Sequence, residues 1–269
     1  MLTSWLINLS FMSVNLVIPN PLAYDMGWVG DWNGSSCVAI GRHWAITAAH
    51  TGGGPGSGLR FNGQNYQVVE RVVHPTSDLA LLRFVEPLDD WHPLGTSLQQ
   101  GDEIIVGGYG LTGAVGSNWV FPRAERWGTN IVQSAYSQIS FDFSAPSDST
   151  ATPHESSAAL NDSGGGVFST SSDGTLYLEG VIVTTSPFGS SPYGANNYAI
   201  KLAPFIPWIQ QNISDADWNG DGVVNVPDIF SFLTDWHARA GLADFDDNGI
   251  ENVQDIFAFI SVWQANRQI

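Results

Sequence analysis

The sequence predicts a mainly β protein that ends in a small helical module. Between residues 27 and 198, short runs rich in β-branched and aromatic residues alternate with glycine-rich or polar turns. The 29 glycines and 14 prolines are spread along the chain, which is typical of barrels and sandwiches built from many short strands. After residue 216 the pattern changes to a loop-and-helix unit that occurs twice, at an offset of 27 residues.

The composition describes a folded protein with an acidic surface. The 269 residues are 43% hydrophobic and 13% charged, enough for one large domain and a small one. The net charge is −17, and Lys201 is the only lysine. Such a chain repels phosphate groups, so we expect no nucleic-acid partner. The acidity fits either simple solubility or bound cations.

The N-terminal segment, residues 1–23, has the outline of a secretory signal, with an apolar stretch followed by the small Ala23. No Lys or Arg precedes Arg42, which is unusual for a signal, so an N-terminal arm packed on the domain is the alternative. No later stretch is long and apolar enough for a transmembrane helix. We therefore expect a secreted or cell-surface protein. The single cysteine, Cys37, excludes an intramolecular disulfide and is expected to be a small core residue.

The elements can be assigned by periodicity. Strands are expected at residues 66–74, 79–85, 103–110, 138–143 and 175–185. Within residues 203–213, apolar side chains spaced along one face predict a short helix. We place the boundary between a large domain, residues 24–213, and a small one, residues 214–269.

Three short segments carry residues suited to nucleophilic catalysis. Ser163 lies in the run Asn-Asp-Ser-Gly-Gly-Gly, where glycines leave its hydroxyl accessible. His50 ends the apolar run Trp-Ala-Ile-Thr-Ala-Ala, and Asp78 directly precedes the apolar run Leu-Ala-Leu-Leu. Each residue alone would be interpreted as a turn or strand-end residue. Burial would make Asp78 a fixed, ionised partner for a histidine.

Together, in the order His50, Asp78, Ser163, these segments resemble the TAAH, D-I-A-L-L and G-D-S-G-G motifs of the chymotrypsin- and trypsin-type serine proteases. The resemblance covers roughly residues 27–213. It implies two antiparallel β-barrels with the active site between them. It also implies a serine endopeptidase that acts on polypeptides, with Ser163 as nucleophile, His50 as general base and Asp78 as the residue that orients it. The backbone N–H groups of Asn161 and Ser163 would form the oxyanion hole.

The chain departs from that family at several positions. Asn161 stands where the family has a glycine, and Thr51 where many relatives have a cysteine. Counting back from the serine places Ser157 at the base of the specificity pocket, which favours uncharged substrate side chains, although nearby Glu155 could enter. The family's Ile-Val-Gly-Gly start, whose amine pairs with the acid equivalent to Asp162, is missing.

The two C-terminal repeats place oxygen ligands at spacings that suit calcium. Oxygen side chains at positions 1, 3, 5, 9 and 12 of each loop, a carbonyl at position 7 and a glycine at the turn are what a hard cation with six or seven ligands requires. The predicted ligands are Asp217, Asn219, Asp221, Val223, Asn225 and Asp228 in the first loop, and Asp244, Asp246, Asn248, Ile250, Asn252 and Asp255 in the second. Apolar residues recur in the helix of each repeat, so we expect the two helices to pack on each other: Ile229, Phe230, Phe232 and Trp236 match Ile256, Phe257, Phe259 and Trp263.

This pair of repeats resembles a dockerin module, because each loop ends in Asp and lacks an entering helix. The resemblance implies two Ca²⁺ ions and attachment to a cohesin-like or surface scaffold partner. The Ser-Thr pair that dockerins commonly use for cohesins is replaced by Val226-Pro227 and Val253-Gln254. An alternative reading of the whole chain is a catalytically weak, protease-like binding protein attached through this module.

Overall fold

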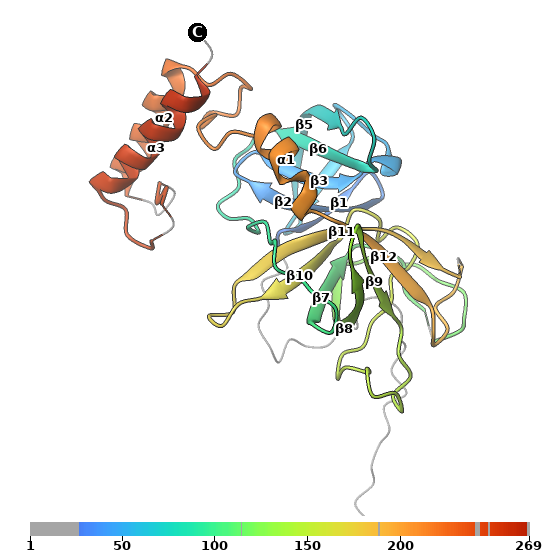
Figure 1. Ribbon diagram of the computed structural model, residues 1–269. Helices are drawn as coiled ribbons and strands as arrows, with labels where there is room; N and C mark the ends of the chain where they lie inside the picture. The colour runs from blue at the N-terminus through green and yellow to red at the C-terminus, as the bar shows by residue number, and fades with distance from the viewer. Residues whose placement is uncertain (1–26, 114, 188, 240–242, 247, 268–269) are drawn as a thin grey trace, which may run out of the picture.

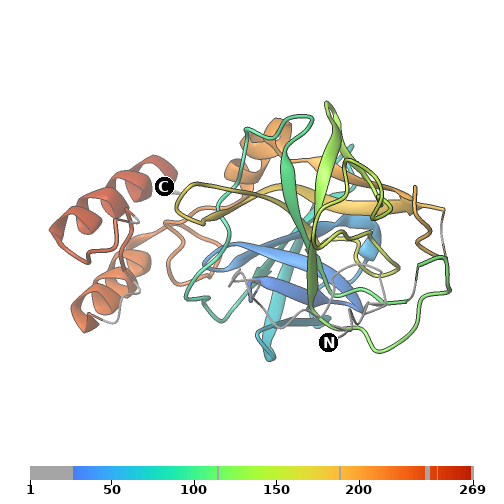
Figure 2. The ribbon, with the colours of Figure 1, turned by 90° about the horizontal axis from the view of Figure 1, so that it is seen from below.

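The computed structural model describes residues 27–113, 115–187, 189–239, 243–246 and 248–267. The predicted signal or arm, residues 1–23, lies outside them. Two β-barrels stack on each other, and a pair of helices lies to one side of the first barrel (Figures 1 and 2). In the described residues no helix is long and apolar enough to cross a membrane.

The first barrel is closed in the strand order β1-β2-β3-β6-β5-β4. Its interior is filled by large side chains such as Trp32, Phe61 and Phe84. Cys37 is fully buried among them, and this burial raises the pKa of its thiol, so it is a packing residue, as expected. The strands are β1 (Val29–Trp32), β2 (Ser35–Gly41), β3 (Trp44–Ala48), β4 (Gly58–Phe61), β5 (Gln64–Val73) and β6 (Leu79–Phe84).

The second barrel is closed in the order β10-β11-β12-β9-β8-β7 and has its own apolar interior, which includes Phe141, Val167 and Ile182. Its strands are β7 (Glu103–Gly108), β8 (Arg126–Ala135), β9 (Gln138–Asp142), β10 (Gly166–Thr170), β11 (Leu176–Ser186) and β12 (Asn196–Lys201). A 3₁₀ turn (Ala203–Phe205) and helix α1 (Ile206–Asn212) follow, within the range predicted for a short helix. The prediction of two antiparallel barrels is confirmed.

A third apolar cluster joins the barrels. Val38, Ile46 and Leu81 of the first barrel pack in one cluster with Phe168 and Val181 of the second. Alternate residues of these strands point either into their own barrel or toward the other barrel, which is why the strands appear in the sequence as continuous apolar runs.

The C-terminal module is a pair of loop-and-helix units related by the sequence repeat. Helices α2 (Val226–Ala238) and α3 (Val253–Asn266) pack through Phe232 and Phe259, whose rings stack 4.2 Å apart and 1° from parallel. Trp236 donates to the carbonyl of Asn252 at 2.9 Å, and the equivalent Trp263 donates to that of Asn225 at 2.7 Å. The two units therefore hold each other in place through ring stacking and reciprocal hydrogen bonds.

The two helices pack on each other as predicted, but one pair of the repeated apolar residues lies outside their interface. Phe230 and Phe257 are 66% and 67% exposed. They lie two residues before the stacked Phe232 and Phe259, and positions two apart on a helix face different sides. The repeat pattern alone cannot separate an inward from an outward Phe when both recur.

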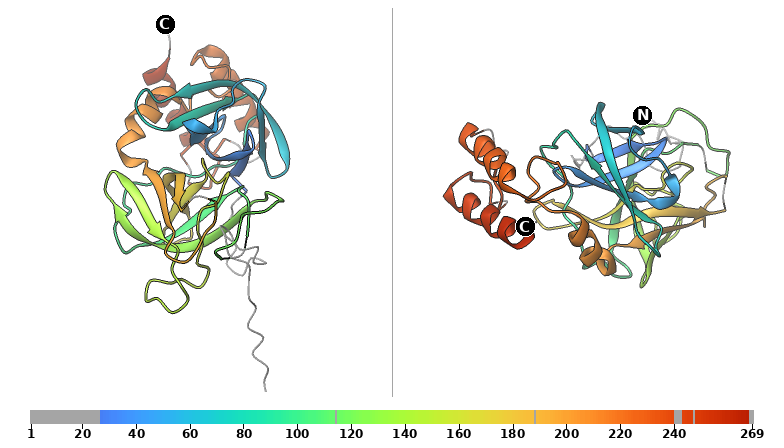
Figure 3. Two further views of the ribbon diagram at one scale, coloured as in Figure 1. Left: turned by 90° about the vertical axis from the view of Figure 1, so that its right-hand side faces the viewer. Right: turned by 90° about the horizontal axis from the view of Figure 1, so that it is seen from above.

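The module packs on the first barrel, and Figure 3 shows the two helices beside it in two further views. Arg83 of β6 donates to the carbonyl of Gly220 at 2.6 Å. Arg42 forms an ion pair with Asp235 at 2.7 Å, and its guanidinium lies 4.1 Å from the centroid of the Trp218 ring. These contacts come from the β2–β3 turn and from β6, and they reach the first loop of the module and helix α2.

Candidate active site

The register of β3 and β6 brings His50 and Asp78 together. These strands pair antiparallel from Trp44↔Arg83 to Ala48↔Leu79. His50 follows the end of β3 and Asp78 precedes the start of β6, so the two residues meet at the same end of the barrel. Nδ1 of His50 lies 2.6 Å from Oδ2 of Asp78, and the backbone N–H of His50 donates to Oδ1 at 2.7 Å.

Asp78 is held by these contacts although it is only partly buried. Its side chain is 37% exposed and that of His50 is 47% exposed. The carbonyl of Asp78 accepts from the N–H of Ala49 at 3.1 Å, which adds a backbone bond to the two carboxylate bonds. Three hydrogen bonds, and not enclosure, therefore fix the position of this acid.

Ser163 is presented by a loop that is anchored to both barrels. The carbonyl of Ser163 accepts from the N–H of Ser36 at 3.0 Å, and the N–H of Gly164 donates to Ile182 at 2.8 Å. Gly164 has φ +90°, and a Cβ there would lie 1.9 Å from the carbonyl oxygen of Ser36. Only glycine lets the loop approach the first barrel this closely.

His50 and Ser163 line one cleft between the barrels, with a volume of about 440 Å³. The hydroxyl of Ser163 donates to the carbonyl of Val183 at 3.4 Å in this structure. Val183 also lines the cleft, and the other lining residues are Asn33, Gly34, Ser35, Thr51, Ala159, Leu160, Asn161, Thr184 and Thr185. No Asp, Glu, Lys or Arg is among these lining residues.

The loop before Ser163 leaves two N–H groups available. Asn161 adopts φ 74°, the left-handed conformation that Asn tolerates better than most residues. Its carbonyl accepts from the hydroxyls of Ser35 and Ser36 at 3.2 and 3.0 Å. Among the hydrogen bonds between described residues, none uses the N–H of Asn161 or Ser163. Both groups are free to bind an oxyanion.

Ser157 is not among the residues that line this cleft. It is fully buried, and its hydroxyl donates to Oδ1 of Asn197 at 3.0 Å. Glu155 also stays out of the cleft, because its carboxylate accepts from the N–H groups of Ser144 and Thr152, both at 2.8 Å. The sequence missed Thr185, which lines the cleft, is 6% exposed and has a hydroxyl without a partner.

Asp162, beside the nucleophile position, is satisfied by backbone groups. Its carboxylate accepts from Gly110 at 2.7 Å and from Ala159 at 2.8 Å. A Cβ at Gly110 would lie 2.4 Å from its carboxyl carbon, so this position requires glycine. Burial raises the pKa of Asp162 to about 7, and the two backbone bonds and the nearby charge of Arg126 oppose that rise. Among the described residues, backbone N–H groups hold this carboxylate, and the loop is fixed through them.

The first predicted calcium loop contains buried oxygens with no donor. Oδ1 of Asp217 and Oδ1 of Asn225 are buried and make no hydrogen bond to described residues. Oδ2 of Asp217 accepts from Gly222 at 2.9 Å, and Asp228 accepts from Asn219 and Asn225. Two unpaired oxygens inside one loop suit a cation as their partner.

In the second loop the carboxylates of Asp244, Asp246 and Asp255 converge, with ligand oxygens within 4.8 Å of one another. Among the residues the structure describes, no other His, Cys, Asp or Glu group meets this criterion, so the acids of the first loop are less closely gathered. Val223 and Ile250 have aliphatic side chains, which point to solvent, so only their backbone carbonyls can serve as the ligands predicted at position 7. Asn248 and Asn252 bond within the second loop, as Asn219 and Asp221 do in the first.

No protein-family model matches the chain, and no curated protein matches it. Among solved structures it is similar to neuropsin, a serine protease expressed in the limbic system of mouse brain. The TM-score is 0.53 and the identity 17%, over 70% of this chain and 94% of the neuropsin chain. At this identity the likeness shows the fold. The chain has the double-barrel fold of the trypsin-like serine proteases.

Proposed function

We propose that this chain is a serine endopeptidase that cleaves polypeptides through an acyl-enzyme. The observation that carries the proposal is the cleft shared by His50 and Ser163, with Asp78 bonded to the opposite side of the imidazole. On the double-barrel fold, these are the residue types that acyl transfer requires, in positions suited to their roles.

The Asp78 carboxylate can only accept at neutral pH, so it selects the tautomer of His50 with the proton on Nδ1. Nε2 then carries the lone pair that takes the proton of Ser163. The serine hydroxyl turns from the Val183 carbonyl to the imidazole by a change of χ1, and in apo structures such catalytic bonds are often unformed. Ser163 attacks the substrate carbonyl, the protonated His50 gives its proton to the leaving amine, and water hydrolyses the ester.

The oxyanion of each tetrahedral intermediate would be stabilised by the N–H groups of Asn161 and Ser163. Each such donor contributes about 3 kcal/mol of transition-state stabilisation in comparable sites. The left-handed conformation of Asn161 supports this assignment, because it stands where the family has a glycine. The backbone-bonded Asp162 holds the same loop, so we propose that the enzyme needs no freed N-terminal amine for activity.

The substrate side chain next to the cleaved bond is proposed to be small and uncharged. The lining residues carry no acid to pair with Lys or Arg. Thr184 and Thr185 form part of the wall, and their branched side chains narrow the space. The Ser157 hydroxyl, tied to Asn197 below, adds no charge.

We also propose that the C-terminal module is a dockerin-like unit that holds two Ca²⁺ ions. The unpaired buried oxygens of the first loop and the three converging carboxylates of the second fit a hard cation. Calcium, when bound, would supply the positive charge that offsets the repulsion between these carboxylates. The residues that would hold it are those predicted at positions 1, 3, 5, 7, 9 and 12 of each loop.

The same module is proposed to attach the enzyme to a scaffold or surface partner outside the cell. Val226 and Phe230 of the first unit are 52% and 66% exposed, and the equivalent Val253 and Phe257 are 54% and 67% exposed. A duplicated set of exposed apolar side chains on a soluble module is typical of a protein-binding surface. A cohesin-like protein is one such partner.

Hydrolysis of a peptide library by the purified chain tests the enzyme proposal. Wild-type protein should cleave after small uncharged residues, and Ser163→Ala should lower turnover by at least about a thousand-fold while the thermal midpoint stays unchanged. Unchanged turnover in this variant would argue against Ser163 as the nucleophile. Binding of peptides without cleavage by the wild type would favour the weakly catalytic binding protein, for which the Ser163–Val183 bond is the supporting observation.

Calcium titration of the chelator-treated full chain tests the module. Two bound ions per chain are expected, and Asp228→Ala combined with Asp255→Ala should abolish binding while the serine still reacts with an active-site probe. Retention of both ions in this double variant would contradict the assigned ligands.

A further inference from the structure

A second cleft, outside the catalytic one, opens in the second barrel between the chain that links the barrels and the β10–β11 hairpin. Its volume is about 520 Å³, within the range of small-molecule sites. Its lining residues have no member in common with those of the catalytic cleft. β11 contributes Glu179 here and Thr185 to the catalytic cleft, six residues and roughly 20 Å further along the strand.

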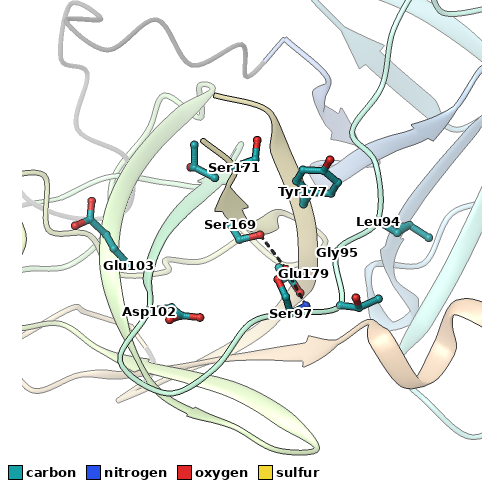
Figure 4. Close-up of a pocket in the computed structure, with 11 residues that line it drawn as sticks. Leu94, Gly95, Ser97, Asp102, Glu103, Ser169, Ser171, Tyr177 and Glu179 are labelled. Atoms are coloured by element: carbon teal, nitrogen blue, oxygen red, sulfur yellow. Dashed lines mark hydrogen bonds between the residues drawn. The ribbon is translucent and has the colours of Figure 1, made fainter. Parts of the chain in front are cut away.

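Glu179 is the unusual group in this cleft. It is fully buried, and its Oε2 makes no hydrogen bond. Oε1 accepts from the Ser169 hydroxyl at 2.9 Å and from the N–H of Ser97 at 3.4 Å (Figure 4). Gly95 makes room for the carboxylate, because a Cβ there would lie 2.4 Å from Cδ of Glu179. The chain therefore holds a buried acid with one oxygen unsatisfied.

A buried carboxylate is unfavourable unless a cation or several donors compensate it. None of the lining residues is Lys, Arg or His, and no ion pair between described residues includes Glu179. Asp102 and Glu103 add further negative charge to the lining. The cleft thus lacks the positive charge that its buried acid calls for.

We propose that this cleft binds an organic cation, an ammonium or guanidinium group that donates to Oε2 of Glu179. The space is far larger than a bare ion needs. A metal ion is also disfavoured, since Glu179 belongs to no group of three converging His, Cys, Asp or Glu ligands in the described residues. Tyr177, 36% exposed, lines the same cleft and offers a ring face to a cation.

The cation can come from a free amine or from a Lys or Arg side chain of a bound polypeptide. The chemistry at Glu179 is the same in both cases. In the second case the cleft would be an additional contact site for a protein substrate or partner. The inference does not depend on the proposed protease activity, because none of its residues belongs to the catalytic cleft.

The test uses the full chain with Ser163→Ala, so that peptides stay intact, and backbone amide NMR. Agmatine is the free cation, and the capped peptide acetyl-Gly-Arg-Gly-amide represents a polypeptide. Saturable shifts of the Gly95 and Ser97 amides are expected with at least one of them. Tighter binding of the peptide would identify a polypeptide source, and tighter binding of agmatine a free amine.

Glu179→Gln should weaken this binding roughly ten- to a hundred-fold, the loss expected when a hydrogen bond to a charged group is removed. Glu86→Gln is the matched control, because it removes the same charge from an exposed carboxyl of the first barrel that lines neither cleft. It should change the affinity by less than about two-fold.

If Glu179→Gln does not fold, Tyr177→Ala should still weaken the binding of the cation, and the amide shifts of the wild-type sequence at these positions still decide the question. The absence of saturable shifts with both probes at roughly 10 mM would overturn the proposal. So would equal weakening by Glu86→Gln and Glu179→Gln, or shifts of these amides with Ca²⁺ alone.

Discussion

Asp78→Asn is the substitution whose effect the structure predicts in most detail. Asp78 makes two side-chain bonds to the same residue, accepting from the backbone N–H of His50 through Oδ1 and from Nδ1 through Oδ2. An asparagine side chain has one acceptor and one donor end. The backbone N–H keeps the amide oxygen, so the NH₂ group must face Nδ1.

That arrangement forces the proton of His50 onto Nε2, the nitrogen that has to accept the proton of Ser163. We expect kcat to fall by about 10⁴ at neutral pH, the size of effect seen for the same change in such a triad, or about 5 kcal/mol of transition-state stabilisation. Stability should change little, because the Asp78 side chain is 37% exposed and exposed pairs contribute less than about 1 kcal/mol.

The assay compares kcat and the thermal midpoint of Asp78→Asn with those of Asp78→Ala. The alanine variant frees His50 to choose either tautomer, so it should lose less activity than the asparagine variant. A loss of kcat below about ten-fold for Asp78→Asn would refute the assigned role of Asp78 as the residue that sets the tautomer.

Three further predictions follow from other contacts. Arg83→Met removes the bond to the Gly220 carbonyl, about 1.5–3 kcal/mol for a charged donor, so the nonspecific protease proteinase K should cut the segment before the module at least about ten times faster. The exposed Arg60→Met is the control, and equal rates would contradict the docking. Asp162 has a pKa of about 7 when folded and about 4 when unfolded, so its contribution to stability falls as pH rises between these values. In Asp162→Asn, the urea midpoint should therefore vary less with pH between pH 4 and 8 than in the wild type. An unchanged slope would assign the pH dependence of stability to other groups. Thr185→Gly widens the cleft, so kcat/KM for a Phe substrate relative to an Ala substrate should rise roughly ten-fold. An unchanged ratio would show that Thr185 does not limit the size of the substrate side chain.

The barrels could be predicted from the sequence because strands and turns leave local patterns. The three motifs around His50, Asp78 and Ser163 also occur in the chain order of the protease family that they resemble. The pairing of His50 with Asp78 also follows from local signals, since each lies at the end of an apolar strand. The exposure of Asp78 could not be predicted, because it depends on how far the neighbouring loops enclose it. Counting back from Ser163 predicts that Ser157 lies at the base of the specificity pocket, but counting cannot show that its side chain is buried and bonded to Asn197.

Contacts between distant segments left no signal in the sequence. The docking of the module depends on Arg42 in the β2–β3 turn and on Arg83, which lie more than 130 residues before the residues they contact. Glu179 and Gly95 are likewise far apart in sequence, and a glutamate in an otherwise apolar strand gives no hint of which oxygen lacks a partner. Such contacts are set by tertiary packing, which periodicity does not encode.

The central claim is that Ser163 is an activated nucleophile, and labelling with a fluorophosphonate tests it most directly. An ordinary serine hydroxyl does not react with this probe at a useful rate, whereas a serine paired with a general base does. We predict one label per chain, located by mass spectrometry on Ser163, and loss of labelling in His50→Ala. An unlabelled protein that is folded, or a label on another serine, would contradict the proposed function.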